Sequence, residues 1–197
     1  MWRSFSALAL AASPALADPD ICAEYWYSRN AIFNYGGYCF GSALGQAEFD
    51  NSDCIPGPPA LSESDAVQVT QIRTYEDHFD CAVNTGTQSI AFSTKPLLSR
   101  LIDLPVRGFD GSVDDPVSLE FTAACINYLG PTPIALRAGT TTDTPIIGAI
   151  KPGDDVITSH HGLNGWTYLT ARGPGDQDSG GWTSTPFASL TCEGFAG

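Results

Sequence analysis

Six cysteines constrain this chain of 197 residues more than any other feature, because their pairing limits how its segments can pack. They stand at positions 22, 39, 54, 81, 125 and 192. An even number of cysteines in an exported chain is typical of a disulfide framework, and six allow fifteen connectivities. Zinc sites need closely spaced pairs such as C-x-x-C, and no two of these cysteines stand that close. We therefore expect three disulfides and no metal site.

The first 17 residues have the pattern of a secretory signal peptide. Arg3 supplies a positive charge, an Ala/Leu-rich run follows, and Ala15-Leu16-Ala17 gives a small-x-small cleavage pattern before Asp18. This run is too short to span a bilayer. The sequence therefore predicts a bacterial protein that is secreted or periplasmic after cleavage behind Ala17. Its mature part has no further membrane segment.

The chain is strongly acidic, with 22 acids, 9 bases and a net charge of −13. The signal segment holds one base and no acid, so the mature chain would have 8 bases and a net charge of −14. Nucleic acids and anionic membranes need clustered Lys and Arg, so neither is expected as a partner. A hydrophobic content of 43% is enough for a folded core.

The first part of the mature chain has the periodicity of helices. Helices are predicted over Asp18–Phe33, Ala43–Phe49 and Ser62–Cys81, because apolar residues recur at helical spacing and Ser62 with Asp65 resembles a capping box. Gln88–Ser93 could form a strand and Pro96–Ile102 a short helix.

From Val117 onward the pattern changes to short β-type runs separated by Gly- and Pro-rich turns, which is typical of a small barrel or sandwich. The predicted runs are Ser118–Tyr128, Ile134–Arg137, Pro145–Ile150, Asp155–Ser159, Trp166–Thr170 and Trp182–Ser184. We therefore expect an α+β protein of two small domains. Its parts are a signal peptide (1–17), a disulfide-tied helical unit (18–85), a connector (86–116) and an all-β unit (117–194).

The helical unit resembles the YARHG domain, an extracytoplasmic bacterial module of unknown activity. The residues that carry the resemblance are Tyr25-Trp26-Tyr27-Ser28-Arg29-Asn30-Ala31-Ile32-Phe33, then Gly37-Tyr38 and Phe40. The Ala-Arg-His stretch that gives the family its name is replaced here by Asn34-Tyr35-Gly36. The resemblance thus implies a structural or interaction module and not a basic Arg-His site.

The β unit resembles a bacterial SH3-like domain over about 70 residues. The matching segments are Leu136-Arg137-Ala138-Gly139, Thr144-Pro145-Ile146-Ile147-Gly148-Ala149-Ile150, Lys151-Pro152-Gly153-Asp154-Asp155-Val156, Gly165-Trp166-Thr167-Tyr168 and Gly181-Trp182-Thr183. The resemblance implies an SH3-like barrel, with a long loop over Gly173–Gly181 as a local addition. In such a barrel the first and last strands are neighbours, which implies a Cys125–Cys192 disulfide. The other four cysteines would stay in the helical unit, as Cys39–Cys54 and Cys22–Cys81.

Most motifs with known chemistry are incomplete. Asp178-Ser179-Gly180-Gly181 resembles the nucleophile segment of trypsin-like proteases, but the segment around Cys125 lacks the histidine that a triad needs. His160 and His161 are expected in a solvated loop, and His78 near a helix C-terminus. The acidic turn Asp110–Asp115 leaves open a weak calcium site, although it lacks the register of an EF-hand.

The sequence therefore favours binding without catalysis and without a cofactor. Small SH3-like barrels present aromatic side chains along a groove. The candidate ligand-binding residues are Tyr128, Arg137, Trp166, Tyr168 and Trp182. The expected function is that of a cell-envelope binding protein whose partner is a peptidoglycan peptide or an envelope protein. Its acidic surface favours a basic partner. The alternatives are a small acidic cell-wall hydrolase and a structural or inhibitory protein that binds a protein surface.

Overall fold

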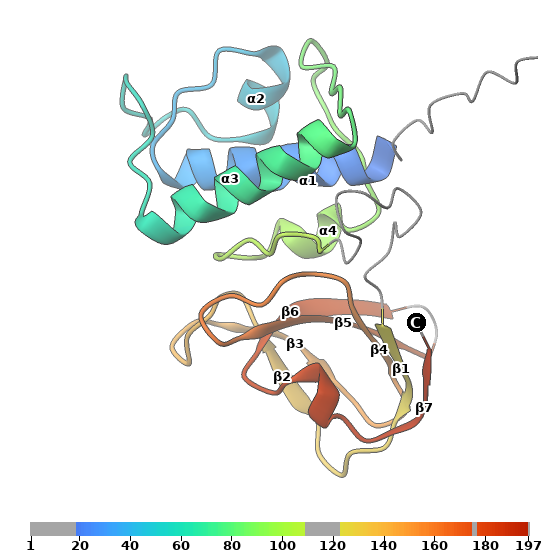
Figure 1. Cartoon of the computed structure of the whole chain (residues 1–197). Coiled ribbons are helices and arrows are strands. Elements are labelled where there is room, and N and C mark those ends of the chain that lie inside the picture. Colours follow the sequence, from blue (N-terminus) through green and yellow to red (C-terminus); the bar gives the residue numbers. More distant parts are fainter. Residues whose placement is uncertain (1–18, 109–122, 175–176, 197) are drawn as a thin grey trace, which may run out of the picture.

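A layer of helices packs on one antiparallel sheet in the computed structural model, which describes residues 19–108, 123–174 and 177–196 (Figure 1). The predicted signal peptide and the acidic turn Asp110–Asp115 lie outside these described residues. Within the described ranges, no helix combines the length and the apolar character that crossing a membrane requires.

The helical layer contains four helices, and their bounds follow the sequence pattern closely. They are α1 (Pro19–Tyr35), α2 (Ala43–Glu48), α3 (Glu63–His78) and α4 (Lys95–Leu98). At the start of α3, the Ser62 side chain accepts from the Asp65 backbone N–H, and the Asp65 carboxylate accepts from the Ser62 backbone N–H. This capping box satisfies two backbone donors that the helix cannot satisfy itself. The predicted strand over Gln88–Ser93 is wrong, because that segment has no strand.

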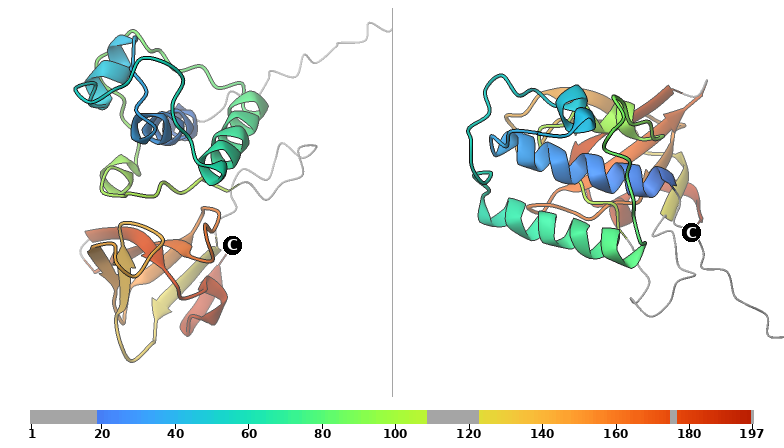
Figure 2. Two further views of the ribbon diagram at one scale, coloured as in Figure 1. Left: turned by 90° about the vertical axis from the view of Figure 1, so that its left-hand side faces the viewer. Right: turned by 90° about the horizontal axis from the view of Figure 1, so that it is seen from above.

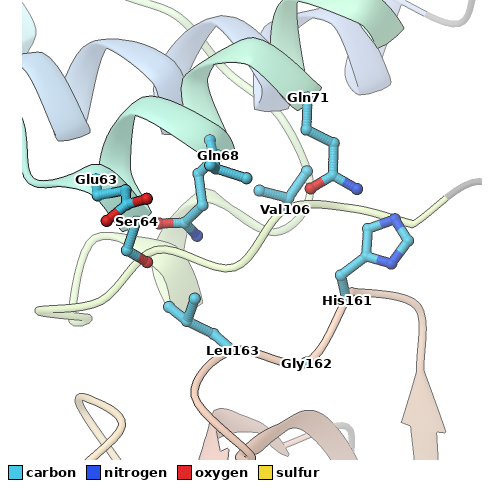
Figure 3. Close-up of a pocket in the computed structure, with 9 residues that line it drawn as sticks. Glu63, Ser64, Gln68, Gln71, Val106, His161, Gly162 and Leu163 are labelled. Carbon is cyan, nitrogen blue, oxygen red and sulfur yellow. The ribbon is translucent and has the colours of Figure 1, made fainter.

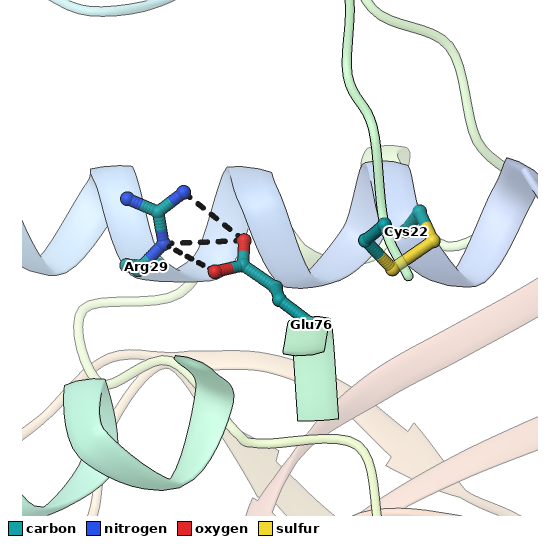
Figure 4. Close-up of a disulfide and its surroundings, with 4 residues drawn as sticks. Cys22, Arg29 and Glu76 are labelled. Atoms are coloured by element: carbon teal, nitrogen blue, oxygen red, sulfur yellow. Dashed lines mark hydrogen bonds and ion pairs between the residues drawn. A yellow bond between two sulfur atoms is a disulfide. The ribbon is translucent and has the colours of Figure 1, made fainter. Parts of the chain in front are cut away.

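Helices α1 and α3 lie side by side, and three kinds of contact join them (Figures 1 and 2). The Arg29 guanidinium holds the Glu76 carboxylate at 2.8 Å, with three hydrogen bonds between the two groups (Figure 4). The ring of Tyr25 packs on those of Tyr75 and Phe79. A disulfide from Cys22 ties the start of α1 to the segment after α3. Arg29 of the YARHG-like sequence motif thus acts within the helical layer.

The sheet contains seven described strands. They are β1 (Ala123–Tyr128), β2 (Ile134–Arg137), β3 (Ile146–Ile150), β4 (Asp155–Thr158), β5 (Thr167–Gly173), β6 (Gln177–Thr183) and β7 (Cys192–Ala196). Their order is β3-β2-β6-β5-β4-β1-β7, and neighbouring strands pair antiparallel. The first and last strands pair, as the sequence implied. Among the described strands, however, the edges β3 and β7 do not pair, so the sheet is not closed into a barrel.

Two sequence-based expectations for the sheet need correction. The Gly-rich segment expected as a long loop over Gly173–Gly181 is mostly strand, because β5 and β6 form a hairpin that pairs down to Gly173 and Gln177. Strand β7 lies in a stretch where no β-type run was expected. It forms a strand because it pairs with β1, and this partner cannot be recognised from the residues of β7 alone.

Three disulfides are present in the structure, and every cysteine takes part in one. They join Cys22 to Cys81, Cys39 to Cys54 and Cys125 to Cys192. The first two lie within the helical layer, and the third links β1 to β7. These are the same pairs that the sequence favoured.

The segment expected as a connector packs between the helices and the sheet. Leu98 of α4 is fully buried, and Leu101 and Leu104 are 3% exposed. They belong to one core cluster with Trp26 of α1 and Trp182 of β6. The described part of this segment, residues 86–108, therefore joins the two layers into one hydrophobic core.

Candidate functional site

A cavity lies between helix α3 and the segment that joins β4 to β5 (Figure 3). Its volume is about 420 Å³, which is in the range of small-ligand sites. The lining residues are Glu63, Ser64, Val67, Gln68, Gln71, Val106, His161, Gly162 and Leu163. We call it the α3 pocket. Ligand sites often occur where two structural units meet, so it is the first candidate for a binding site.

His161 forms the sheet side of the α3 pocket, in contact with the helical layer. Its Nε2 lies 2.8 Å from the hydroxyl of Tyr75, and the two rings stack with centroids 6.1 Å apart. Its backbone N–H donates to the carbonyl of Val106. Burial, and then the charge of His160, lower the pKa of His161 below its usual 6.5. The ring is therefore neutral at pH 7 and can both donate and accept a hydrogen bond.

The helix side of the α3 pocket supplies amide groups. Gln68 donates from Nε2 to the carbonyl of Leu104, and Gln71 donates from Nε2 to the hydroxyl of Tyr75. The stretch from Ser62 to Gln71 places these side chains on one face because they follow helical spacing. The pocket can thus hydrogen-bond a polar ligand while Val67, Val106 and Leu163 contact its apolar part.

A buried polar cluster lies deeper between the layers, centred on Glu24 of α1. Its Oε1 lies 2.8 Å from His160 Nε2, and both side chains are almost fully buried. Its Oε2 accepts from Arg107 Nη1 at 3.1 Å and from the Thr94 hydroxyl at 2.6 Å. The Ser159 hydroxyl lies 2.9 Å from His160 Nδ1. The expectation of a solvated His160 is therefore wrong, since its ring enters the core instead.

The electrostatics of this cluster hold Glu24 as a carboxylate. Burial acts to raise its pKa, but the hydrogen bond and charge of His160, the charge of Arg107 and the Thr94 hydroxyl together lower it from 4.5 to about 2. A buried charge is tolerated when it is paired and hydrogen-bonded in this way. The cluster joins α1, the segment before residue 109 and the sheet. Its first role is to hold the layers together.

The aromatic side chains that the sequence proposed for a groove lie mostly in the core. Tyr168 is 1% exposed, Trp182 is fully buried and Tyr128 is 6% exposed. Trp182 donates from Nε1 to the carbonyl of Asp103 at 2.7 Å, and its ring packs on Tyr168. The structure therefore brings Tyr168 and Trp182 together beneath the helices and places Tyr128 in a separate core cluster.

The other two candidates are partly exposed. Arg137 lies in β2, where Nη1 donates to the carbonyl of Thr144 at 2.7 Å and supports the turn between β2 and β3. Trp166 is half-buried against the interlayer core. Neither residue lines the α3 pocket. The proposed set thus does not form one surface.

Sequence reasoning missed the residues that matter most here, namely Glu24, Arg107, Gln68 and Gln71. In the sequence, Glu24 is an acid near the start of a predicted helix, where an acid suits the helix dipole and indicates nothing more. For Arg107 the sequence offers one signal, which is that bases are scarce: Arg107 is one of nine in the chain. The glutamines carried no signal, since their role depends on the segment that packs across α3.

Comparison with known protein families gives two matches. A family model described as Domain of unknown function (DUF4453) matches residues 80–197. The model of the YARHG domain matches residues 3–77, which confirms that resemblance. No curated protein matches the chain, and no solved structure matches it. The first match includes residues 86–108, the segment that packs between helices and sheet.

Two of these findings indicate the kind of compartment in which the protein resides. The YARHG domain is extracytoplasmic. Three disulfides indicate an oxidising environment, since cytosolic thiols are kept reduced.

Proposed function

The chain belongs to the family described as Domain of unknown function (DUF4453), and from this premise we propose that it is a secreted or periplasmic cell-envelope binding protein without catalysis. Its ligand is a peptidoglycan peptide or a segment of an envelope protein, and it needs no cofactor. The α3 pocket is its binding site. The observation that carries the proposal is the position of this pocket, between the YARHG helices and the sheet of the second family.

Two further properties of the pocket support binding. Gln68, Gln71 and His161 bring hydrogen-bonding groups to a cavity that apolar side chains also line, which is the usual composition of a ligand site. Val67 is 63% exposed at the pocket, although it is a large apolar side chain on a helix. A ligand that covers Val67 would remove this apolar surface from water.

The proposal includes export by the signal peptide over residues 1–17. The disulfides support it, because their formation needs an oxidising compartment. The mass of the protein recovered from the cell envelope would test it. A mature chain that begins at Asp18 is expected, and a chain that keeps Met1 contradicts the proposal.

We also propose that the sheet is an opened relative of the bacterial SH3-like barrel. The five matching segments support this, and so does the pairing of β1 with β7. An experimental structure with a different strand order would contradict it.

Retention on purified peptidoglycan tests the binding site. Val67→Glu places a charge on the apolar wall of the α3 pocket and is expected to weaken retention at least tenfold. Ile55→Glu is the matched control, because Ile55 is 72% exposed and does not line the pocket. Both variants should unfold at similar temperatures.

Three outcomes decide between the functions. Retention that Val67→Glu reduces and Ile55→Glu preserves supports the proposed site. Equal retention by both variants contradicts it. No retention on peptidoglycan, together with specific cross-linking of an envelope protein that Val67→Glu abolishes, favours the alternative in which this protein binds or inhibits a protein surface.

Hydrolysis is a second candidate function, and two linked contacts favour it. Ser159, His160 and Glu24 are linked in the order hydroxyl, imidazole and carboxylate, at 2.9 and 2.8 Å. Ser159 also lines a cavity of about 290 Å³ together with Arg107. This is the order of groups in an activated serine nucleophile. Labelling of Ser159 by a fluorophosphonate, lost in His160→Gln, would support hydrolysis, and the absence of labelling would contradict it.

A further inference from the structure

The hydrogen bonds around the α3 pocket determine which of its groups can serve a ligand. The hydroxyl of Tyr75 accepts from Gln71 Nε2 and lies 2.8 Å from His161 Nε2. The hydroxyl donates to Nε2 of the ring or accepts from it, according to which ring nitrogen carries the proton. Tyr75, Gln71 and His161 therefore already bond to one another, and a ligand depends on the polar groups of the pocket that lie outside these bonds.

The other polar groups of the α3 pocket are mainly acceptors. Gln68 and Gln71 use their amide nitrogens on Leu104 and Tyr75, and none of the described residues donates to either side-chain carbonyl oxygen. The Glu63 carboxylate can only accept. The pocket thus offers several acceptors against few donors, which favours a ligand rich in N–H groups.

Charge points to the same conclusion. Glu63 is the only charged residue among those that line the pocket, so no Lys or Arg there neutralises it. It lies in the first turn of α3, at the rim of the cavity (Figure 3). The net charge of −13 for the whole chain adds a field of the same sign. A cationic group is therefore favoured at Glu63, and a carboxylate is disfavoured.

The shape of the surface favours an elongated ligand. A second, open hollow continues along α3 and shares Glu63, Val67 and Gln71 with the pocket. Ala66 and Thr70 complete it. Val67, Val106 and Leu163 provide apolar contacts beside the acceptors. An alkyl chain that ends in an ammonium group fits this arrangement, because the chain can contact the apolar wall while the ammonium reaches the acidic rim.

We infer that the ligand of the α3 pocket is a short peptide that carries a primary ammonium group on an alkyl side chain, with that ammonium on Glu63. The peptide backbone then donates N–H groups to the side-chain carbonyl oxygens of Gln68 and Gln71. This inference rests on the proposed function, since it names the ligand class of the same pocket. Among envelope components, a peptidoglycan stem peptide with a diamino acid has this chemistry.

Calorimetry with two synthetic peptides tests the inference. The probe is the tetrapeptide l-Ala-γ-d-Glu-l-Lys-d-Ala with an acetylated N-terminus, and its lysine amine is either free or acetylated. The free amine is expected to bind about tenfold more tightly, because a charge-assisted hydrogen bond at a partly solvated site has about that effect. Glu63→Gln should remove the preference and leave the affinity for the acetylated peptide unchanged.

Asp77→Asn is the matched control for Glu63→Gln. It removes the same charge from an exposed position on the same helix, and Asp77 does not line the pocket. The preference for the free amine should persist in this variant. Equal binding of both peptides by the unsubstituted protein, or a preference that Glu63→Gln leaves intact, would overturn the inference.

Failure of the inference differs from failure of the proposed function. If Val67→Glu abolishes binding of both peptides while the amine makes no difference, the pocket is the binding site and the ammonium inference is wrong. If neither peptide binds and Val67→Glu does not change retention on peptidoglycan, both are wrong.

Discussion

His160 and Glu24 stand 136 positions apart in the chain, and their side chains meet at 2.8 Å in the core between sheet and helices. The Glu24 carboxylate is charged, and both side chains are buried away from water. Arg107 and Thr94 complete the hydrogen bonding of the same carboxylate. This satisfied polar cluster therefore helps to hold the two layers together within a largely apolar interface.

Loss of the Glu24 charge should destabilise the protein. Glu24→Gln keeps the size of the side chain but removes its charge and replaces one oxygen by NH2, so either Arg107 or His160 loses its acceptor, which should cost about 3 kcal/mol of unfolding free energy. Chemical denaturation measures this value. Asp178→Asn is the control, because its ion pair with Arg172 is exposed and such pairs contribute about 0–1 kcal/mol. Equal losses in the two variants would contradict the role of the cluster.

The same carboxylate should give stability a defined dependence on pH. Its pKa is about 2 in the folded protein and 4.5 as its ordinary value, so the unfolded chain binds the proton first as pH falls. The contribution is complete above about pH 4.5 and is lost as pH falls toward 2, with a total of about 3 kcal/mol. Denaturation between pH 2 and 5 measures it. Glu24→Gln should reduce the slope, and an unchanged slope would assign the effect to other acids.

Tyr168 offers a substitution that should not destabilise. Among the described residues, its hydroxyl is a buried polar atom with no hydrogen-bond partner, and burial raises the pKa of Tyr168 above its usual value of 10. Tyr168→Phe removes that hydroxyl and keeps the ring contacts with His160 and Trp182. The unfolding free energy should stay equal or rise by about 1 kcal/mol. A loss of more than 1 kcal/mol would show that the hydroxyl has a partner, such as a bound water.

The three disulfides should differ in their contribution. Cys125–Cys192 spans 67 positions and Cys39–Cys54 spans 15. In the chain-entropy treatment the longer loop contributes about 4 kcal/mol and the shorter one about 3 kcal/mol. Paired Cys→Ala variants, compared by denaturation, measure the difference. The reverse order would show that interactions in the folded state outweigh loop entropy.

The helices and the sheet should unfold together. Leu98 is fully buried between them, and Leu98→Ala should cost about 2–5 kcal/mol. Because it contacts both layers, far-UV circular dichroism and near-UV circular dichroism should report one shared transition before and after the substitution. Two separated transitions would show that the layers are independent.

Much of the local structure could be predicted from the sequence. Helical spacing and the Ser62 capping box place α3 within a few residues, and turn residues place β2 with its observed bounds. Strand β7 is the exception. It contains a glycine, and its residues alone do not predict a strand. It forms because β1 offers a partner, and the Cys125–Cys192 disulfide joins the two.

The sequence by itself determined the number and positions of the cysteines, the acidic charge, the helical and β halves and the resemblance of the first half to the YARHG domain. These properties are local, because they follow from residue type, spacing and period. Only the tertiary structure decided that Tyr168 and Trp182 lie in the core, that His160 meets Glu24 and that Gln71 and His161 face one pocket. Such contacts join segments far apart in the chain, and packing between layers is not encoded in any single segment.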